Sequence, residues 1–196
     1  MAEQILLPGF EPEPELTDRL FFAVLPDQAA IARIAQLSAR LRSAYGLHGR
    51  ALDAGRLHVS LCGLGDHPGL PQQLLAHAGR AADTVALAPF SVSFDSALTF
   101  ANKSRASGGK PFVLCGGDGV AGLTALHQAL ALALRAAGLH GPLNITPHLT
   151  MLYDGATIAP QAIEPVEWQV REFVLIHSRI GQNLPYTVLR RWPLAR

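Results

Sequence analysis

The feature that most constrains the fold is an internal repeat of an apolar strand, a helix and a histidine-bearing strand. Phe22 lies 36 residues before His58, and Phe112 lies 36 residues before His148. Similarity at a fixed spacing within one chain indicates that one supersecondary unit occurs twice. We therefore predict two halves with the same order of elements.

The first copy has the patterns of a buried strand, a helix and a half-exposed strand. Residues 20–25 form a continuous apolar run closed by Pro26, which is typical of a buried strand followed by a helix start. Apolar residues recur at helical spacing over 31–41, and we expect this helix to end near Gly46. Residues 57–61 then alternate apolar and polar side chains, as a strand with one solvated face does.

The second copy repeats this order with its own strand, helix and alternating strand. They are predicted over 111–115, over a leucine stripe at 123–134 and over 147–152. Outside the two copies we expect a short helix and further strands, over 70–82, 90–100, 167–178 and 186–189. The predicted fold class is α+β: two pseudo-symmetric lobes from the duplicated unit, with antiparallel-rich sheets facing across a central cleft and helices outside.

The length of 196 residues suits one compact domain. Hydrophobic residues make up 49% of the chain and charged residues only 16%, which excludes a wholly disordered protein. The first residues contain Pro8-Gly9 and a Glu-Pro alternation over 11–15. We expect residues 1–18 to be a flexible N-terminal tail and residues 19–196 to form a single bilobal domain.

Charge and cysteine content argue against several classes of function. With 16 Lys+Arg against 15 Asp+Glu, the net charge of +1 gives no global basic field to hold a long nucleic-acid duplex. Cys62 and Cys115 alone cannot build a disulfide framework. The sequence shows neither a secretory signal nor an apolar run long enough to cross a bilayer. We expect a soluble cytoplasmic protein with no membrane contact and no obligate protein partner.

Each predicted half carries a histidine and a hydroxyl side chain two residues apart, His58 with Ser60 and His148 with Thr150. Residues i and i+2 of a strand point the same way, so each motif offers both groups to the cleft. An imidazole titrates at a pKa of roughly 6.5, so one ring can act as a base and the other as an acid. This pattern suits in-line displacement at phosphorus, with the two hydroxyls binding non-bridging phosphate oxygens.

These paired motifs resemble the two-histidine (2H) phosphoesterase superfamily, and within it the bacterial RNA 2′,3′-cyclic phosphodiesterases, also called the 2′-5′ RNA ligase family. The resemblance covers residues 19–194. Besides the two motifs it rests on the opening run 19–26, Leu64-Gly65, Pro147, Ser178, Tyr186 and the closing Arg191-Trp192-Pro193-Leu194.

The resemblance implies that the chain opens the 2′,3′-cyclic phosphate ends of RNA or nucleotides to 2′-phosphomonoesters without a cofactor or metal. It also implies, for some members, a reversible 2′-5′ joining activity. His58 and His148 would be catalytic, with Ser60 and Thr150 binding phosphate. By the resemblance His58 protonates the leaving 3′-oxygen and His148 activates water, although the sequence itself does not order the two.

Two departures from the family pattern bear on substrate binding. Cys62-Gly63 replaces a usual aromatic residue after the first motif, which changes either base stacking or local packing. Many members carry an arginine after the second motif, where this chain has Leu152-Tyr153-Asp154. The candidate substrate contacts, four of them cations that would compensate for the missing arginine, are Arg56, Lys103, Arg105, Lys110 and Tyr153.

Other interpretations of the same residues stay open at this point. The second interpretation is a noncatalytic module whose cleft binds an RNA end. The third is a metal-dependent hydrolase with the two histidines as ligands, for which the sequence offers no convincing third ligand. Tyr186 and Trp192 are candidates for base stacking, but core packing is the stronger expectation for both. His177, late in a strand, is a candidate for supporting the catalytic pair.

Overall fold

Eight antiparallel strands dominate the computed structural model, which describes residues 14–100 and 109–195. The strands of the first half and its C-terminal extension are β1 (Asp18–Val24), β2 (Val59–His67), β7 (Glu172–Arg179) and β8 (Thr187–Pro193). Those of the second half are β3 (Phe90–Thr99), β4 (Lys110–Cys115), β5 (His148–Asp154) and β6 (Gln161–Val170). The helices are α1 (Gln28–Tyr45), α2 (Gln72–Ala82) and α3 (Ala121–Ala136), with short 3-10 turns η1 (Ala54–Arg56) and η2 (Asp118–Val120).

The repeated unit predicted from the sequence is present as β1-α1-β2 and β4-α3-β5. The Asp27 carboxylate accepts a hydrogen bond from the Ala30 amide at 2.8 Å and so caps the start of α1. Gly46, with a φ of 60°, ends the same helix in the left-handed conformation that glycine adopts without steric cost. The predicted end of this helix is therefore confirmed.

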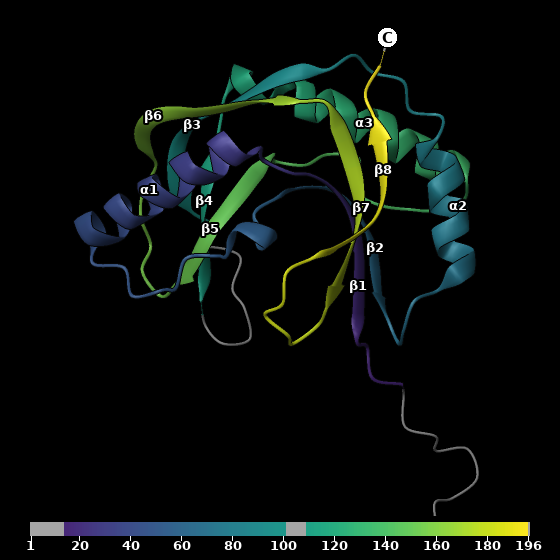
Figure 1. Ribbon diagram of the computed structural model, residues 1–196, viewed down its shortest axis with the longest axis horizontal. Helices are drawn as coiled ribbons and strands as arrows, with labels where there is room; N and C mark the ends of the chain where they lie inside the picture. Colours follow the sequence, from purple (N-terminus) through teal and green to yellow (C-terminus); the bar gives the residue numbers. More distant parts are fainter. Residues whose placement is uncertain (1–13, 101–108, 196) are drawn as a thin grey trace, which may run out of the picture.

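The described strands form one sheet in the order β6-β3-β4-β5-β2-β1-β7-β8. The α+β class and the antiparallel sheet are confirmed. The two sets of strands do not form separate sheets, however, because β2 and β5 pair antiparallel at Val59 and Leu149 and join them. From this junction β4 and β5 diverge from β1 and β2 (Figure 1).

The strand predicted over 167–178 is wrong in its extent. It is the end of β6 and nearly all of β7, separated at Arg171. β6 pairs with β3 and β7 pairs with β1, so the chain passes from one half of the sheet to the other at this point. β6 buries alternate side chains near its end and β7 buries five consecutive ones, and in the sequence the two together look like one longer strand.

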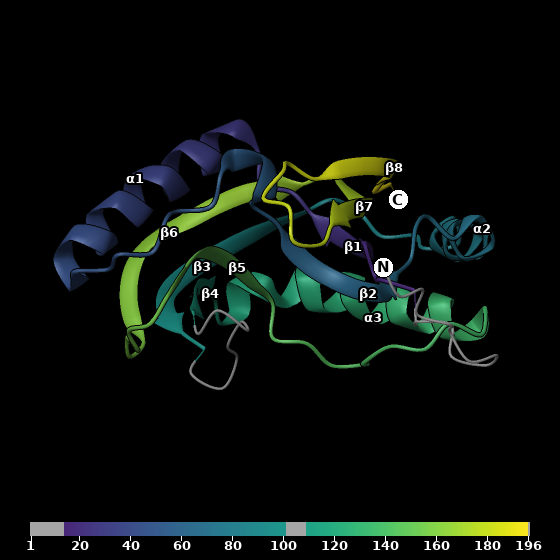
Figure 2. The same ribbon diagram turned by 90° about the horizontal axis from the view of Figure 1, so that it is seen from below.

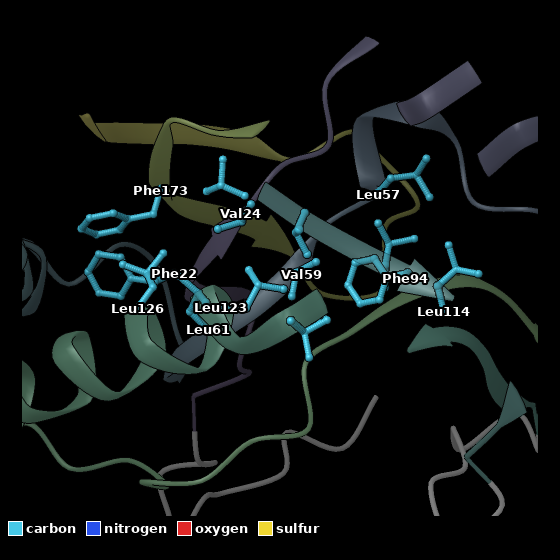
Figure 3. Packing of buried hydrophobic residues seen from close by; sticks show 14 of the residues in the cluster. Phe22, Val24, Leu57, Val59, Leu61, Phe94, Leu114, Leu123, Leu126 and Phe173 are labelled. Carbon is cyan, nitrogen blue, oxygen red and sulfur yellow. The ribbon is translucent and has the colours of Figure 1, made fainter. Parts of the chain in front are cut away.

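The main core lies between the sheet and its helices. Side chains from β1, β2 and α3, among them Phe22, Val59, Leu123 and Leu126, pack together there (Figure 3). The helices α1 and α3 lie on either side of the curved strands when the molecule is turned by 90° (Figure 2).

A second, smaller cluster lies on the opposite face of β1 and β7 and comprises Phe21, Ala23, Val174 and Ile176. Its β1 residues alternate with those in the main core, so β1 is buried on both faces. This explains why the sequence there is continuously apolar.

The predicted tail of residues 1–18 lies mostly outside the described residues. Of its described part, Asp18 is already the first residue of β1 and is buried.

Candidate functional site

The junction between β2 and β5 brings the two predicted motifs together. Val59 and Leu149 are paired there and fully buried in the main core. Their sequence neighbours point to the other face of the sheet, because side chains alternate along a strand. In this antiparallel register Ser60 lies opposite His148, and His58 lies opposite Thr150.

All four side chains line one pocket with a volume of about 390 Å³. Most of its other lining residues come from β1, β2 and the segment between β7 and β8. They are Arg19, Leu20, Phe21, Arg56, Gly63, Gly65, Asp66, Tyr153, Ser178 and Tyr186. Residues that are 90 positions apart in the chain thus share one cavity.

His58 precedes β2 and is held by its own backbone. Its Nδ1–H donates to the carbonyl oxygen of Arg56 at 2.9 Å, which leaves Nε2 as the atom that gains or loses a proton. The ring also contacts the rings of Phe21 and Tyr186, with both centroid distances 5.1 Å. This aromatic wall shields His58 from water.

His148, the first residue of β5, is held in the same way. Its Nδ1–H donates to the carbonyl oxygen of Thr146 at 2.8 Å, again two residues earlier in the chain. The ring of Phe100 meets it edge-on with a centroid distance of 4.9 Å. Both imidazoles therefore present Nε2 as their titrating atom.

Burial lowers the pKa of His58 from 6.5 to about 4. The nearby His148 and Arg56 lower this pKa further, while the hydrogen bond to the Arg56 carbonyl opposes the shift. His58 is therefore neutral at pH 7 in the unliganded pocket. A neutral ring with its proton on Nδ1 offers the lone pair of Nε2 to a proton donor.

The charged side chains that line the pocket are Arg19, Asp66 and Arg56. Arg19 and Asp66 form a two-point ion pair, with Nε to Oδ1 and Nη2 to Oδ2 both 2.7 Å. The hydrogen bond from Arg19 lowers the pKa of the Asp66 carboxyl. Arg56 has no such partner among the described carboxylates.

Of the candidate substrate contacts, the structure brings Arg56 and Tyr153 to the pocket. The Asp154 carboxylate accepts the amides of His48 and Gly49 at 2.8 and 2.6 Å, so it ties the loop after α1 to the end of β5 beside Tyr153. A Cβ at Gly49 would lie 2.0 Å from the Tyr153 carbonyl oxygen, so this close approach requires glycine.

Of the remaining candidate cations, Lys110 is the one within the described residues. It does not line the pocket, and its Nζ donates to the hydroxyl of Thr157 at 2.7 Å. This contact directs Lys110 away from the role predicted for it. Lys103 and Arg105 lie outside the described residues.

The structure also places Trp192, Tyr186 and His177, for which the sequence suggested base stacking, core packing or support of the catalytic pair. Trp192 is buried and stacked on Phe173 with a centroid distance of 5.3 Å, so core packing is confirmed for it. Tyr186 packs against the smaller cluster, with its ring centroid 5.5 Å from that of Phe21, and it also lines the pocket. His177 is buried against Asp18 and does not line the pocket.

The two residues that replace the usual aromatic residue of the family have different positions: Cys62 packs in the core, and Gly63 lines the pocket. Cys62 is buried in the main core, where its Sγ lies 3.5 Å from Nδ1 of His127, and burial raises its pKa to about 12. Gly63 lines the pocket and places no side chain there.

Phe21, Phe100, Arg19 and Asp66 shape the site but were not predicted. Phe21 belongs to an apolar run, and Phe100 follows a strand, so neither carries a polar or spacing signal. Arg19 and Asp66 are brought together by the register of β1 and β2. Only the pairing of strands reveals them.

Across the described ranges, no group of three or more His, Cys, Asp or Glu side chains is arranged to hold a metal ion. None of the described helices is long and apolar enough to cross a membrane.

This fold and the paired histidine motifs define a known class of protein. The sequence profile of the 2′-5′ RNA ligase superfamily matches residues 25–182, and the chain belongs to this family of two-histidine phosphoesterases. A comparison with curated proteins found no match.

Solved structures share the fold over nearly the whole chain. LigT of E. coli in its apo form is 24% identical, covers 93% of this chain and 100% of its own, and superposes with a TM-score of 0.71. The same protein complexed with 3′-AMP is 25% identical at the same coverage, with a TM-score of 0.69. TT0787 of Thermus thermophilus is 22% identical, covering 90% of this chain and 97% of its own, with a TM-score of 0.68.

Proposed function

We propose that this protein is a phosphodiesterase that opens 2′,3′-cyclic phosphate ends of RNA or nucleotides to 2′-phosphomonoesters, using His58 and His148 and no metal ion or cofactor. The observation that carries this proposal is the convergence of both motifs in one pocket. The family assignment supports it. So do the solved complexes of E. coli LigT with 3′-AMP, ATP, phosphate and NADP+, in which this relative accommodates nucleotides and phosphate.

In the proposed reaction a water molecule attacks the phosphorus of the cyclic phosphate. One histidine accepts a proton from this water through Nε2 as the new P–O bond forms. The P–O bond to the ribose 3′-oxygen breaks, and the other histidine donates a proton to that oxygen. The hydroxyls of Ser60 and Thr150 donate to non-bridging oxygens, where negative charge grows in the transition state.

We assign His58 as the base and His148 as the acid, the reverse of the order that the family resemblance implies. His58 is neutral at pH 7 because its pKa is about 4, and its Nε2 lone pair is available in the unliganded pocket. The proton donor of the pair is then His148, which opposes Ser60 rather than Thr150 across the strand pair.

The same steps account for 2′-5′ joining when a 5′-hydroxyl replaces water as the nucleophile. Its proton passes to the base, the 3′-oxygen leaves protonated, and a 2′-5′ phosphodiester forms. No additional residue is required. We extend the proposal to a cytoplasmic location, since RNA ends and nucleotides are the expected partners.

The test is to incubate the protein with 2′,3′-cyclic AMP and with an RNA ending in a cyclic phosphate, in a strong chelator, and to identify products by phosphorus NMR. We expect the 2′-phosphomonoester at an undiminished rate. A 3′-phosphate as product would contradict the proposed regiochemistry, and loss of turnover in the chelator would indicate a metal-dependent hydrolase.

The same experiment distinguishes the proposed enzyme from a noncatalytic module that binds RNA ends. A protein that binds 2′,3′-cyclic AMP, with no product from either substrate, would be such a module. An enzyme in which both histidines are replaced by alanine should still bind the nucleotide and release no product.

A further inference from the structure

We propose that Arg56 is the phosphate-binding cation of this site and that its guanidinium contacts a non-bridging oxygen of the substrate. This inference deepens the proposed function, on which it rests for the identity of the ligand as a phosphodiester. It also makes a separate claim, because phosphate binding by Arg56 is measurable without any turnover.

The first argument is the charge balance of the pocket wall. Arg19 is neutralised by Asp66 through two hydrogen bonds of 2.7 Å. Arg56 is the remaining lining side chain with a fixed charge, and no described carboxylate pairs with it. The described part of the wall therefore carries one uncompensated positive charge, which suits a single phosphodiester monoanion.

The second argument is the burial of Arg56, of whose surface only 8% is exposed. A buried charge is costly unless it is paired, so a guanidinium in this position is poised to accept an anion. The Nε atom is buried and has no hydrogen-bond partner among the described residues. The described hydrogen bonds of the Arg56 side chain use Nη1 alone, so most of its five guanidinium N–H donors are not committed to the protein.

The third argument is that the side chain is already held in place. Nη1 lies 3.2 Å from the carbonyl oxygen of Gln182 and 3.4 Å from Oδ1 of Asn183. The guanidinium carbon lies 5.1 Å from the centroid of the Tyr186 ring. A cation fixed before the ligand arrives loses little entropy on binding.

The backbone of the same residue positions the proposed base. The Arg56 carbonyl accepts the Nδ1–H of His58, so guanidinium and imidazole lie in a fixed relation. Arg56 also contributes to the low pKa of His58, as two nearby cations would repel each other. Both observations place Arg56 beside His58, the residue proposed to act on the phosphate. Many family members carry an arginine after the second motif, where this chain has Tyr153. In this chain Arg56 would supply the positive charge instead.

The experiment measures binding of inorganic phosphate by isothermal titration calorimetry, in the wild type and in Arg56→Met, Arg56→Lys and Arg50→Met. Arg50 is the matched control, since its exposed side chain pairs with Asp53 outside the pocket. We expect Arg56→Met to weaken phosphate binding by about 10- to 100-fold, and Arg56→Lys by less because it retains the charge. Arg50→Met should leave the affinity unchanged.

A second measurement follows the wild-type protein directly and needs only the conservative variant Arg56→Lys for assignment. The Nε–H signal of Arg56 in a ¹H–¹⁵N NMR spectrum, assigned by its loss in Arg56→Lys, should shift on addition of inorganic phosphate. Equal phosphate affinity in wild type and a folded Arg56→Met, or no shift of this signal at saturating phosphate, would overturn the inference. A wild type that binds phosphate through Arg56 but releases no product would leave the inference standing and reject the proposed function.

Discussion

The two histidine motifs are held by the same local geometry in different surroundings. In each, Nδ1–H donates to the carbonyl oxygen two residues earlier, at 2.9 Å for His58 and 2.8 Å for His148. Around His58, however, Phe21, Tyr186 and the buried Arg56 form one wall. His148 begins a strand and contacts the ring of Phe100.

This comparison separates two properties that a sequence motif cannot distinguish. The repeated hydrogen bond fixes which nitrogen of each ring titrates, because it depends only on the histidine and the backbone two residues before it. The protonation state depends on burial and neighbouring charge, which come from other strands. A duplicated unit can thus supply two chemically different groups once its copies meet different partners.

The largest expected effect tests this division of roles. His58→Ala and His148→Ala should each lower turnover of 2′,3′-cyclic AMP by about 10²- to 10⁴-fold, since each removes one proton transfer. On a p-nitrophenyl phosphodiester, whose leaving group needs no proton, the variant that lacks the acid should lose much less. We expect this partial rescue in His148→Ala.

The control for these variants is His77→Ala, because His77 is exposed on α2 and should not affect either rate. Rescue in His58→Ala instead would restore the order implied by the family resemblance. Equal losses on both substrates would show that the two rings do not divide acid and base roles.

The next effect concerns stability. The pKa of His58 is about 4 in the folded protein and roughly 6.5 in the unfolded chain. Between these two pH values the unfolded chain therefore binds a proton at His58 that the folded protein does not. The free energy of unfolding should therefore fall as the pH is lowered from about 6.5 to about 4, by at most about 3 kcal/mol from this group.

Urea unfolding at pH 7, 5.5 and 4.5 measures this contribution as the difference between wild type and His58→Gln. As the pH falls, the free energy of unfolding should decrease more for the wild type than for His58→Gln. The control His77→Gln should show the same pH dependence as the wild type. A wild type and His58→Gln that lose stability in parallel would mean that His58 keeps an ordinary pKa, and the contrast between the two motifs would disappear.

The sequence predicted the elements of this fold better than their arrangement. The matched spacing of Phe22 to His58 and Phe112 to His148 identified both strand-helix-strand units, because each periodicity reports local structure. It did not reveal that β2 and β5 pair, since the pairing of two strands from different units depends on the whole chain. The break at Arg171 was missed for the same reason.

The candidate site divides along a similar line. His58, Ser60, His148 and Thr150 were predictable because the period of two along a strand already puts each histidine and hydroxyl on one face. The ring of Phe21 beside His58 and the Arg19–Asp66 pair were not, because strand register and tertiary packing create them. The uncommitted charge of Arg56 became visible only when the partners of every other lining charge were known.

The smallest expected effect sharpens the comparison at the two hydroxyls. Ser60 is exposed and opposes His148, whereas Thr150 is half-buried and opposes His58. Ser60→Ala and Thr150→Val should each lower kcat by about 10-fold through loss of one hydrogen bond to the phosphate, and Thr150→Ser should retain most activity.

Because both hydroxyls are expected to contact the same group, the double variant should lose less than the product of the single losses. Fully multiplicative losses would mean that the two hydroxyls act independently, and an active Thr150→Val would confine phosphate binding to the first motif and Arg56.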